Sequence, residues 1–286
     1  ETRGIHPSCS SCAGGHTSNC ENYAEGSLAP GLFTGICRDI NGGFAPYLVA
    51  HRSQLFRVPA GTTPESAVLT EPLAVALQAV LDNRPHDEES ILVIGGGVIG
   101  LLVVRVIRSL GCQCRITVAD PSSLATEYAV NSGADKVISG NIIDAAVEIT
   151  GGRTYKPLLG EPIVMGGFHR IYDTVGSRQT LHRAMRILAT AGVLSVLGIG
   201  GHVKLDLTPL WLKLQSIRGC YGYGWHKTGR TMNPVFGMAL DMIAWKKVSV
   251  MDMLTHTYPL EEYRTLIDVN LNKGKNRAMK TAFLFD

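Results

Sequence analysis

Residues 91–100 read Ile-Leu-Val-Ile-Gly-Gly-Gly-Val-Ile-Gly. The first four form a short apolar run, which is typical of a strand buried on both faces of a parallel sheet. The next six fit the pattern Gly-x-Gly-x-x-Gly, and residues 98–110 continue as an apolar segment that stops at Gly111. A buried strand, a glycine-rich turn and a helix in this order predict a phosphate-binding βα unit.

The rest of the chain alternates between strand and helix signals. We predict strands at 114–119, 136–138, 170–175, 193–197 and 217–221, and helices at 122–132, 178–189, 209–215 and 234–246. This alternation predicts an α/β fold, a doubly wound parallel sheet of the Rossmann type. Residues 155–169 break the rhythm, and we interpret them as an insertion or irregular connection. In residues 1–60, short alternating stretches such as 45–50 indicate irregular β structure. In the tail we predict a helix near 260–269 and a strand near 279–285.

Each position of the glycine motif has a physical reason. Gly95 permits the tight turn, Gly97 lets the backbone approach a pyrophosphate, and Gly100 lets the helix pack closely on the strand. The helix start at Val98 and Ile99 offers free N–H groups and a positive dipole end to phosphates. These five residues are therefore candidates for cofactor binding.

Asp120 ends the next predicted strand, about 20 residues after the glycine motif. A carboxylate there can accept hydrogen bonds from both ribose hydroxyls, and its charge repels a 2′-phosphate. No Lys or Arg occurs from residue 121 to residue 132, so we expect NAD rather than NADP. The alternative is a glycine-rich turn with an unrelated surface aspartate. Val175, Gly198 and Ile199 follow later strands and are further candidates, because ligands collect at the carboxyl ends of such strands.

Three cysteines, Cys9, Cys12 and Cys20, lie close together near the start of the chain, and His6 precedes them. The spacing His-x2-Cys-x2-Cys-x7-Cys supplies four soft ligands for a tetrahedral structural Zn²⁺. His16 lies in the same loop and can replace His6, and free thiols without metal are the alternative interpretation. Seven cysteines are an odd number in a long chain, which argues against a disulfide framework and favours a cytoplasmic protein.

Composition excludes several functional classes. With 286 residues, 45% of them hydrophobic, and a net charge of +3, the chain is expected to fold rather than to stay disordered. The basic excess is too small to predict binding of nucleic acid or of an anionic membrane. The longest uncharged apolar stretch, residues 91–104, is too short to span a bilayer. We expect a small-molecule partner instead.

The motifs together resemble zinc-dependent medium-chain alcohol dehydrogenases. They are the cysteine cluster, residues 42–49 (Gly-Gly-Phe-Ala-Pro-Tyr-Leu-Val), residues 71–76 (Glu-Pro-Leu-Ala-Val-Ala) and the glycine motif with Asp120. The Glu-Pro-Leu segment is most similar to the polyol, glucose, butanediol and threonine dehydrogenase branch.

The resemblance implies a domain plan and an oligomer. A partial GroES-like, β-rich catalytic domain would cover residues 1–62 and carry the structural-zinc loop. A Rossmann NAD-binding domain would cover residues 63–250, and residues 251–286 would return to the catalytic domain. A homodimer or homotetramer is typical of the family.

The resemblance also implies site residues. Glu71 falls on the position that binds the catalytic zinc or its water, and the alternative is that it caps the helix that follows. Lys280 falls near a position that is often basic and can meet the pyrophosphate, and the alternative is a solvated lysine. His6 stands where the family's structural zinc has a cysteine. Polyol dehydrogenases have an arginine after the strand at 217–221, where this chain reads Gly-Cys-Tyr-Gly-Tyr from residue 219 to residue 223.

The expected function is NAD-dependent, zinc-assisted hydride transfer between an alcohol or polyol CH–OH group and nicotinamide. In the family, a Cys and a His-Glu pair upstream of the zinc loop complete the catalytic zinc site, and no His-Glu dipeptide occurs here. We therefore expect this chain to lack the N-terminal catalytic segment. The alternative is a truncated or degenerate, non-catalytic member that retains dinucleotide and structural-zinc binding.

Overall fold

A computed structural model describes residues 4–5, 7–31, 33, 35–158 and 160–285. The chain forms two compact units. Unit 1 comprises Glu1–Gln78 with Tyr221–Asp286, and unit 2 comprises Ala79–Cys220. These units divide at other points than the predicted domain boundaries, 62/63 and 250/251, so the domain plan stays a prediction.

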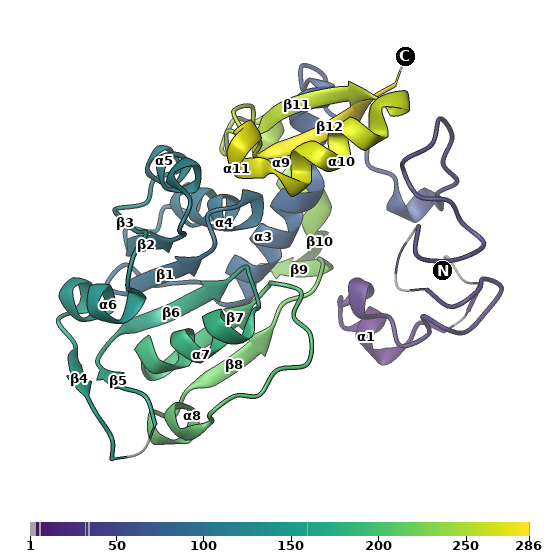
Figure 1. Ribbon diagram of the computed structural model, residues 1–286. Helices are drawn as coiled ribbons and strands as arrows, with labels where there is room; N and C mark the ends of the chain where they lie inside the picture. Colours follow the sequence, from purple (N-terminus) through teal and green to yellow (C-terminus); the bar gives the residue numbers. More distant parts are fainter. Residues whose placement is uncertain (1–3, 6, 32, 34, 159, 286) are drawn as a thin grey trace. The chain divides into compact units, whose positions relative to one another are not determined.

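Unit 2 is built on a six-stranded parallel sheet (Figure 1). Its strands are β1 (Ser90–Ile94), β2 (Arg115–Ala119), β3 (Lys136–Ile138), β6 (Phe168–Asp173), β7 (Leu188–Val196) and β8 (Ser216–Gly219). Their order in the sheet is β3-β2-β1-β6-β7-β8, and every neighbouring pair is parallel. The predicted doubly wound α/β fold is therefore confirmed.

Helices connect these strands. They are α4 (Val98–Ser109), α5 (Ser123–Asn131), α6 (Ile142–Thr150), α7 (Arg178–Ile187) and α8 (Thr208–Leu212). Apolar residues of α6 and α7 pack against those of β1, β6 and β7 in one buried core. Ser122 is the N-cap of α5, because its side chain accepts a hydrogen bond from the N–H of Ala125. The predicted helix at 178–189 ends two residues early, because β7 begins directly at Leu188.

The segment that interrupts the strand–helix rhythm is a hairpin. β4 (Arg153–Tyr155) pairs antiparallel with β5 (Ile163–Met165), so of the two interpretations given for this segment the structure shows an insertion rather than an irregular connection. Lys213 holds this hairpin to the rest of the unit, because its fully buried Nζ donates to the carbonyl of Val164 at 2.7 Å and to that of Arg186 at 3.4 Å. These long-range contacts stabilise a hairpin that short strands alone would not.

Lys213 predicts a stability that rises with pH. Burial lowers the pKa of its ammonium group from 10.5 to about 8. Between those values the unfolded chain binds the proton and the folded chain does not, so the free energy of unfolding increases as pH rises. We expect an increase of about 1–3 kcal/mol in the wild type and none from this source in Lys213→Met. Urea unfolding of both proteins from about pH 7.5 to about pH 10 measures the free energy of unfolding at each pH. The same pH dependence in wild type and Lys213→Met would contradict the prediction.

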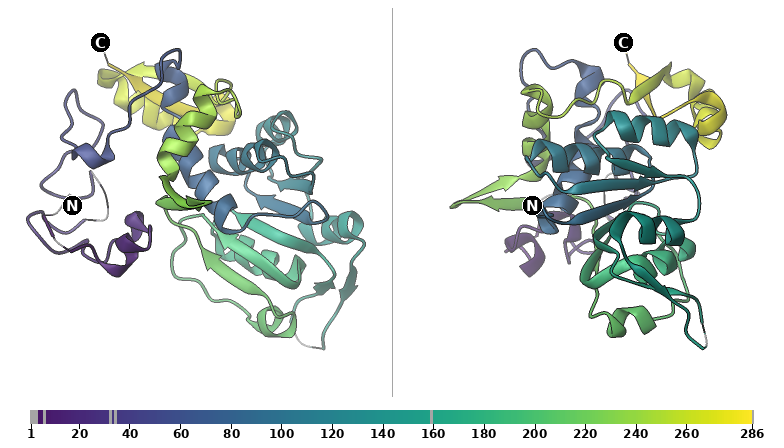
Figure 2. Two further views of the ribbon diagram at one scale, coloured as in Figure 1. Left: turned by 180° about the vertical axis from the view of Figure 1, so that it is seen from behind. Right: turned by 90° about the vertical axis from the view of Figure 1, so that its left-hand side faces the viewer.

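The described residues of unit 1 form helices, most of them short, and two small sheets. Its first part has α1 (Ser10–Ala13), η1 (Thr17–Asn19), η2 (Arg52–Gln54), α2 (Pro64–Ala67) and α3 (Thr70–Asp82), whose last residues belong to unit 2. Its second part has β9 (Trp225–Thr228), β10 (Thr231–Pro234), α9 (Val235–Ala244), β11 (Leu254–Pro259), η3 (Leu260–Glu262), α10 (Tyr263–Leu271), α11 (Lys273–Asn276) and β12 (Lys280–Leu284). β9 and β10 form an antiparallel ribbon (Figure 2).

The strand predictions for unit 1 are confirmed near its end and wrong in its first 60 residues. β11 pairs parallel with β12, which confirms the predicted final strand. Of the described residues up to residue 60, none lies in a strand, so the prediction of irregular β structure there is wrong. The alternating residues 45–50 find no partner strand, and most of them are exposed. Among all described residues, no helix is both long enough and apolar enough to cross a bilayer.

Candidate dinucleotide and metal sites

The glycine turn connects β1 to α4, and three of its positions leave no room for a side chain. A Cβ on Gly96 would lie 2.7 Å from the Cβ of Ala125. Gly95 has φ +98°, and a Cβ there would lie 2.5 Å from Thr174 Oγ1. A Cβ on Gly100 would lie 1.9 Å from the carbonyl oxygen of Gly95. Gly97 is the N-cap of α4, and no described atom lies within 4 Å of a Cβ built on it. The amino end of α4, which begins with Val98 and Ile99, is therefore open to an anion.

The Asp120 carboxylate lies beside this turn, directly after β2. Its Oδ2 accepts the N–H of Gly96 at 2.8 Å, and its Oδ1 accepts the N–H of Ser122 at 2.8 Å. Each carboxylate oxygen can accept a further hydrogen bond. The structure thus brings Asp120 to the glycine turn as the predicted ribose contact requires, and the contact itself stays a prediction.

The carboxyl ends of β6 and β7 are locked together by Asp173, which sequence reasoning missed. The Oδ1 of this fully buried carboxylate accepts the N–H groups of Val175 at 2.9 Å and Gly176 at 3.0 Å. The N–H of Gly198 donates to the Asp173 carbonyl at 3.0 Å. Beyond them, Val175 and Ile199 keep 45% and 96% of their surface exposed. In the sequence, the signal that could have indicated Asp173 is an acidic residue at the end of a buried strand.

The three clustered cysteines come together in unit 1. The sulfurs of Cys9, Cys12 and Cys20 all lie within 4.8 Å of one another, and Cys9 Sγ is 4.0 Å from Cys20 Sγ. Sulfurs around a tetrahedral Zn²⁺ are about 3.8 Å apart when Zn–S is about 2.3 Å. The N–H of Glu21 donates to Cys9 Sγ at 3.4 Å, as expected for a sulfur that carries negative charge. The donor set therefore fits zinc.

The fourth ligand of this cluster is not identified. The predicted ligand His6 lies outside the described residues, and the alternative His16 is not part of the group of ligand atoms. Backbone N–H groups of Cys12 and Glu21 lower the pKa of the Cys9 thiol to about 7. Burial and hydrogen bonds from the other two thiols raise the pKa of Cys12 to about 12. A bound cation would favour the thiolate form of all three.

Glu71 lies in the first turn of α3, and its carboxyl group interacts electrostatically with two other polar groups of unit 1. The residue as a whole is exposed, yet neighbouring atoms desolvate its carboxyl group and raise its pKa, while the charge of Lys280 lowers it. Burial and then the charge of Glu71 raise the pKa of Tyr223 to about 12. Glu71 is not part of any group of three metal-ligand side chains among the described residues.

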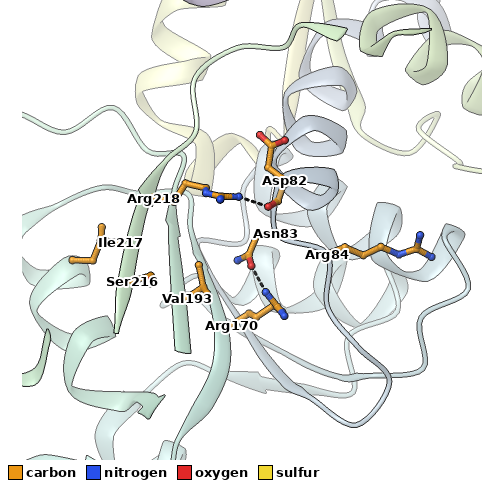
Figure 3. A pocket seen from close by; sticks show the side chains of 8 residues that line it. All are labelled: Asp82, Asn83, Arg84, Arg170, Val193, Ser216, Ile217 and Arg218. Atoms are coloured by element: carbon orange, nitrogen blue, oxygen red, sulfur yellow. Dashed lines mark hydrogen bonds between the residues drawn. The ribbon is translucent and has the colours of Figure 1, made fainter. Parts of the chain in front are cut away.

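A cavity of about 540 Å³ lies away from the glycine turn, where the strands of unit 2 begin (Figure 3). Its lining residues are Asp82, Asn83, Arg84, Arg170, Val193, Ser216, Ile217 and Arg218. Arg170 forms a bidentate ion pair with Glu89 and donates to Asn83, and Arg218 donates to the carbonyl of Asp82 at the end of α3. These guanidinium groups stabilise the fold, and the cavity does not belong to the dinucleotide site.

Comparison with known families identifies the chain. A family model for zinc-binding dehydrogenases matches residues 98–236, the segment from the start of α4 into α9. The chain belongs to the zinc-dependent medium-chain alcohol dehydrogenase family. This membership confirms the resemblance that the sequence motifs indicated.

Relatives of this medium-chain dehydrogenase cover most of the chain. L-threonine 3-dehydrogenase of Pyrococcus horikoshii is 27% identical over 263 residues, which are 90% of this chain and 66% of that protein. The crystal structure of L-idonate 5-dehydrogenase from Escherichia coli covers 97% of this chain and 72% of its own, with a TM-score of 0.76 and 21% identity. A Sinorhizobium meliloti protein assigned to the zinc-binding dehydrogenases was crystallised with NADP; its TM-score is 0.70, with 24% identity over 91% of this chain and 68% of its own.

The similarity to the two crystal structures concerns the fold. They share the Rossmann and GroES-like fold with this medium-chain dehydrogenase. The chain spans about two thirds of the length of the curated threonine dehydrogenase that it matches.

Proposed function

We propose that this chain is part of an NAD-dependent oxidoreductase that transfers a hydride between an alcohol or polyol CH–OH group and nicotinamide, with the assistance of zinc. The observation that carries the proposal is the Asp120 carboxylate beside the open glycine turn at the start of α4. The threonine dehydrogenase relatives support it, because their names give a hydroxyl-bearing amino acid as substrate.

Different groups of unit 2 would bind different parts of the dinucleotide. The N–H groups at the start of α4 would hold the pyrophosphate, and Asp120 would accept the ribose hydroxyls. Val175, Gly198 and Ile199 would line the remaining cofactor surface. The nicotinamide itself supplies the hydride acceptor. The negative charge of Asp120 favours NAD over NADP, although the Sinorhizobium meliloti relative holds NADP.

We propose two positions for zinc, and they differ in how many suitable ligands the chain supplies. Cys9, Cys12 and Cys20 fit a structural zinc, which would tie the loop that contains them. Glu71 occupies the proposed catalytic position, but one carboxylate does not make the three-ligand site that catalytic zinc requires. No step of the reaction is therefore assigned to a metal at Glu71. We further propose a homodimer or homotetramer, because all four residues of β8, at the edge of the sheet, are exposed and could pair with another chain. A cytoplasmic location is proposed from the odd number of cysteines.

The proposal is tested by metal content and turnover together. The purified chain, supplied with Zn²⁺ and NAD⁺, is incubated with a series of secondary alcohols and polyols while NADH fluorescence is recorded. About two zinc ions per chain and alcohol-dependent NADH formation support the enzyme. NAD binding with one zinc or none, and without turnover, would replace the proposal with a non-catalytic dinucleotide-binding protein.

The cysteine cluster predicts a metal-dependent stability. Cys12→Ser removes one of three sulfur ligands, and we expect it to lower the zinc content by about one ion per chain. The melting temperature should fall by several degrees, because metal binding contributes directly to folding of such loops. Calorimetry with and without a chelator measures both effects. The buried Cys37, outside the cluster, provides the control Cys37→Ser, and a chelator-insensitive wild type would show that the loop holds no metal.

A further inference from the structure

The residues that follow β6 connect the ends of its two neighbouring strands. In the sheet of unit 2, β6 lies between β1 and β7 (Figure 1). On the β1 side, the N–H and the Oγ1 of Thr174 each donate to the carbonyl of Ile94 at 2.9 Å. On the β7 side, the N–H of Gly198 donates to the carbonyl of Asp173 at 3.0 Å. Residues 173–176, which we call the β6 turn, therefore link the glycine turn to the end of β7.

The side chain of Asp173 fixes the backbone of the β6 turn. It is fully buried, and its Oδ1 accepts the N–H groups of Val175 at 2.9 Å and of Gly176 at 3.0 Å. Gly176 has φ +70°, and a Cβ on it would lie 2.5 Å from the carbonyl oxygen of Gly198. The β6 turn and the residues after β7 are thus in backbone contact. A displacement of the turn must therefore displace Gly198 as well, because packed segments have no free space between them.

Two exposed apolar side chains are held by this arrangement. A Cβ built on Gly95 would lie 3.0 Å from Cγ2 of Val175, so Val175 lies beside the glycine turn. Ile199 directly follows Gly198, and its side chain is almost fully exposed. Ligands of such sheets bind outside the carboxyl ends of the strands. The two side chains therefore extend the candidate dinucleotide site from the glycine turn toward β7.

The strand order indicates which part of a dinucleotide would meet these side chains. β2 and β6 flank β1 on opposite sides. Asp120 follows β2 and the glycine turn follows β1, and there we place the adenosine ribose and the pyrophosphate. A dinucleotide that binds across the point where the strand order reverses continues on the other side of β1. Its nicotinamide half would therefore lie over the ends of β6 and β7, against Val175 and Ile199.

Packing alone does not account for a carboxylate at residue 173. The Oδ2 of Asp173 is buried, and it has no hydrogen-bond partner among the described residues. A buried polar atom without a partner is unfavourable, and such departures are typical of functional positions. An acidic oxygen is a stronger acceptor than an amide oxygen, so the carboxylate serves the two N–H groups that Oδ1 accepts.

We propose that Asp173 is a positioning residue for the nicotinamide half of the dinucleotide. Because it is fully buried, it acts through the β6 turn and through the exposed side chains of Val175 and Ile199. This inference rests on the proposed function, because it assumes that NAD binds along the glycine turn. Loss of the Asp173 side chain should weaken the contacts of the nicotinamide ring and spare those of the adenosine and the pyrophosphate.

A comparison of NADH with ADP-ribose, which lacks the nicotinamide ring, isolates this half. Isothermal titration of the intact chain gives the dissociation constants of both ligands, and the fluorescence of bound NADH reports on the surroundings of its ring. Wild type should bind NADH more tightly, because the ring buries further apolar surface. Asp173→Ala should weaken NADH binding at least about tenfold and ADP-ribose binding less than about threefold. Asp173→Asn keeps an accepting oxygen and should retain the wild-type ratio of the two constants within about threefold.

Asp135 provides the matched control in the same sheet. Its Oδ2 accepts the N–H of Ile116 at 2.7 Å near the start of β2, at the edge opposite to the glycine turn. Asp135→Ala also removes a carboxylate that holds the backbone, so it should lower the melting temperature without changing the ratio. If Asp173→Ala does not fold, Val175→Ala decides, because it alters only a partly exposed side chain. It should lower the preference for NADH several-fold, and an unchanged preference would overturn the inference.

Several other outcomes would also overturn the inference. They are equal weakening of both ligands in Asp173→Ala, an unchanged ratio in that variant, an Asp173→Asn variant that behaves like Asp173→Ala, and equal binding of both ligands by the wild type. If the wild type forms NADH from an alcohol while Asp173→Ala weakens both ligands equally, the proposed function is supported and the assignment of Asp173 is overturned. Selective loss of NADH binding in Asp173→Ala, without NADH formation by the wild type, would contradict the proposed function and leave the assignment intact. Binding of neither ligand by the wild type would overturn both.

Discussion

Replacing Gly100 by alanine is expected to lower the melting temperature by about 6–12 °C. The new methyl carbon would lie 1.9 Å from the carbonyl oxygen of Gly95, so α4 must move away from β1. Forcing an atom into a packed core costs about 3 kcal/mol, and each kcal/mol shifts the melting temperature of a domain of this size by about 2–4 °C. Differential scanning calorimetry measures the shift.

Gly97 offers the matched control within the same turn. A Cβ built on Gly97 meets no described atom within 4 Å, and the backbone there is extended. The melting temperature of Gly97→Ala should therefore lie within about 2 °C of that of the wild type. Its affinity for NAD⁺ should be at least about tenfold weaker, because the methyl group lies where the pyrophosphate must approach. Equal melting temperatures for the two variants would refute the packing argument. Wild-type NAD⁺ affinity in Gly97→Ala would refute the binding site.

Asp120→Ala is expected to raise the dissociation constant of NAD⁺ by about 10- to 100-fold. The variant loses charge-assisted hydrogen bonds to the ribose, which contribute about 1.5–3 kcal/mol. It also frees the N–H groups of Gly96 and Ser122, which now donate to the carboxylate, so the turn loses part of its support. Isothermal titration with NAD⁺ measures the change, and circular dichroism shows whether the fold is retained.

A second substitution separates the charge of Asp120 from its hydrogen bonds. Asp120→Asn keeps an acceptor oxygen but removes the negative charge, so the affinity for NADP⁺ should rise relative to that for NAD⁺. Asp144→Ala, which removes a carboxylate from the exposed face of α6, should change neither affinity. Identical NAD⁺ affinities in wild type and Asp120→Ala would exclude the ribose contact.

The parts of the fold that were predictable are those that depend on local patterns. β1, the glycine turn, α4 and β2 appear within one or two residues of their predicted bounds. Their apolar runs and glycines restrict the backbone directly, and a parallel strand buried on both faces carries an unbroken apolar signal. The position of Asp120 beside Gly96 follows from the same unit, because both lie at the carboxyl edge of adjacent strands.

Other elements gave a weak or misleading local signal. α6 was not predicted, although Asn141 caps it and Gly151 ends it in the left-handed conformation. The hairpins β4–β5 and β9–β10 depend on pairing between short segments, which the composition of either strand does not reveal. The alternating residues 45–50 suggested a strand, but no partner strand is present among the described residues to pair with them.

By itself, the sequence determined the family, the parallel sheet and the glycine turn with Asp120, because these depend on residue types at fixed short spacings. Only the tertiary structure decided that Ser18 of the cysteine loop holds the backbone of Tyr223, and that the ring of Phe236 packs against those of Tyr223 and Phe56. These residues come from three distant segments, and no spacing in the chain relates them. Their proximity is set by hydrogen bonds and ring packing that exist only once the chain has folded.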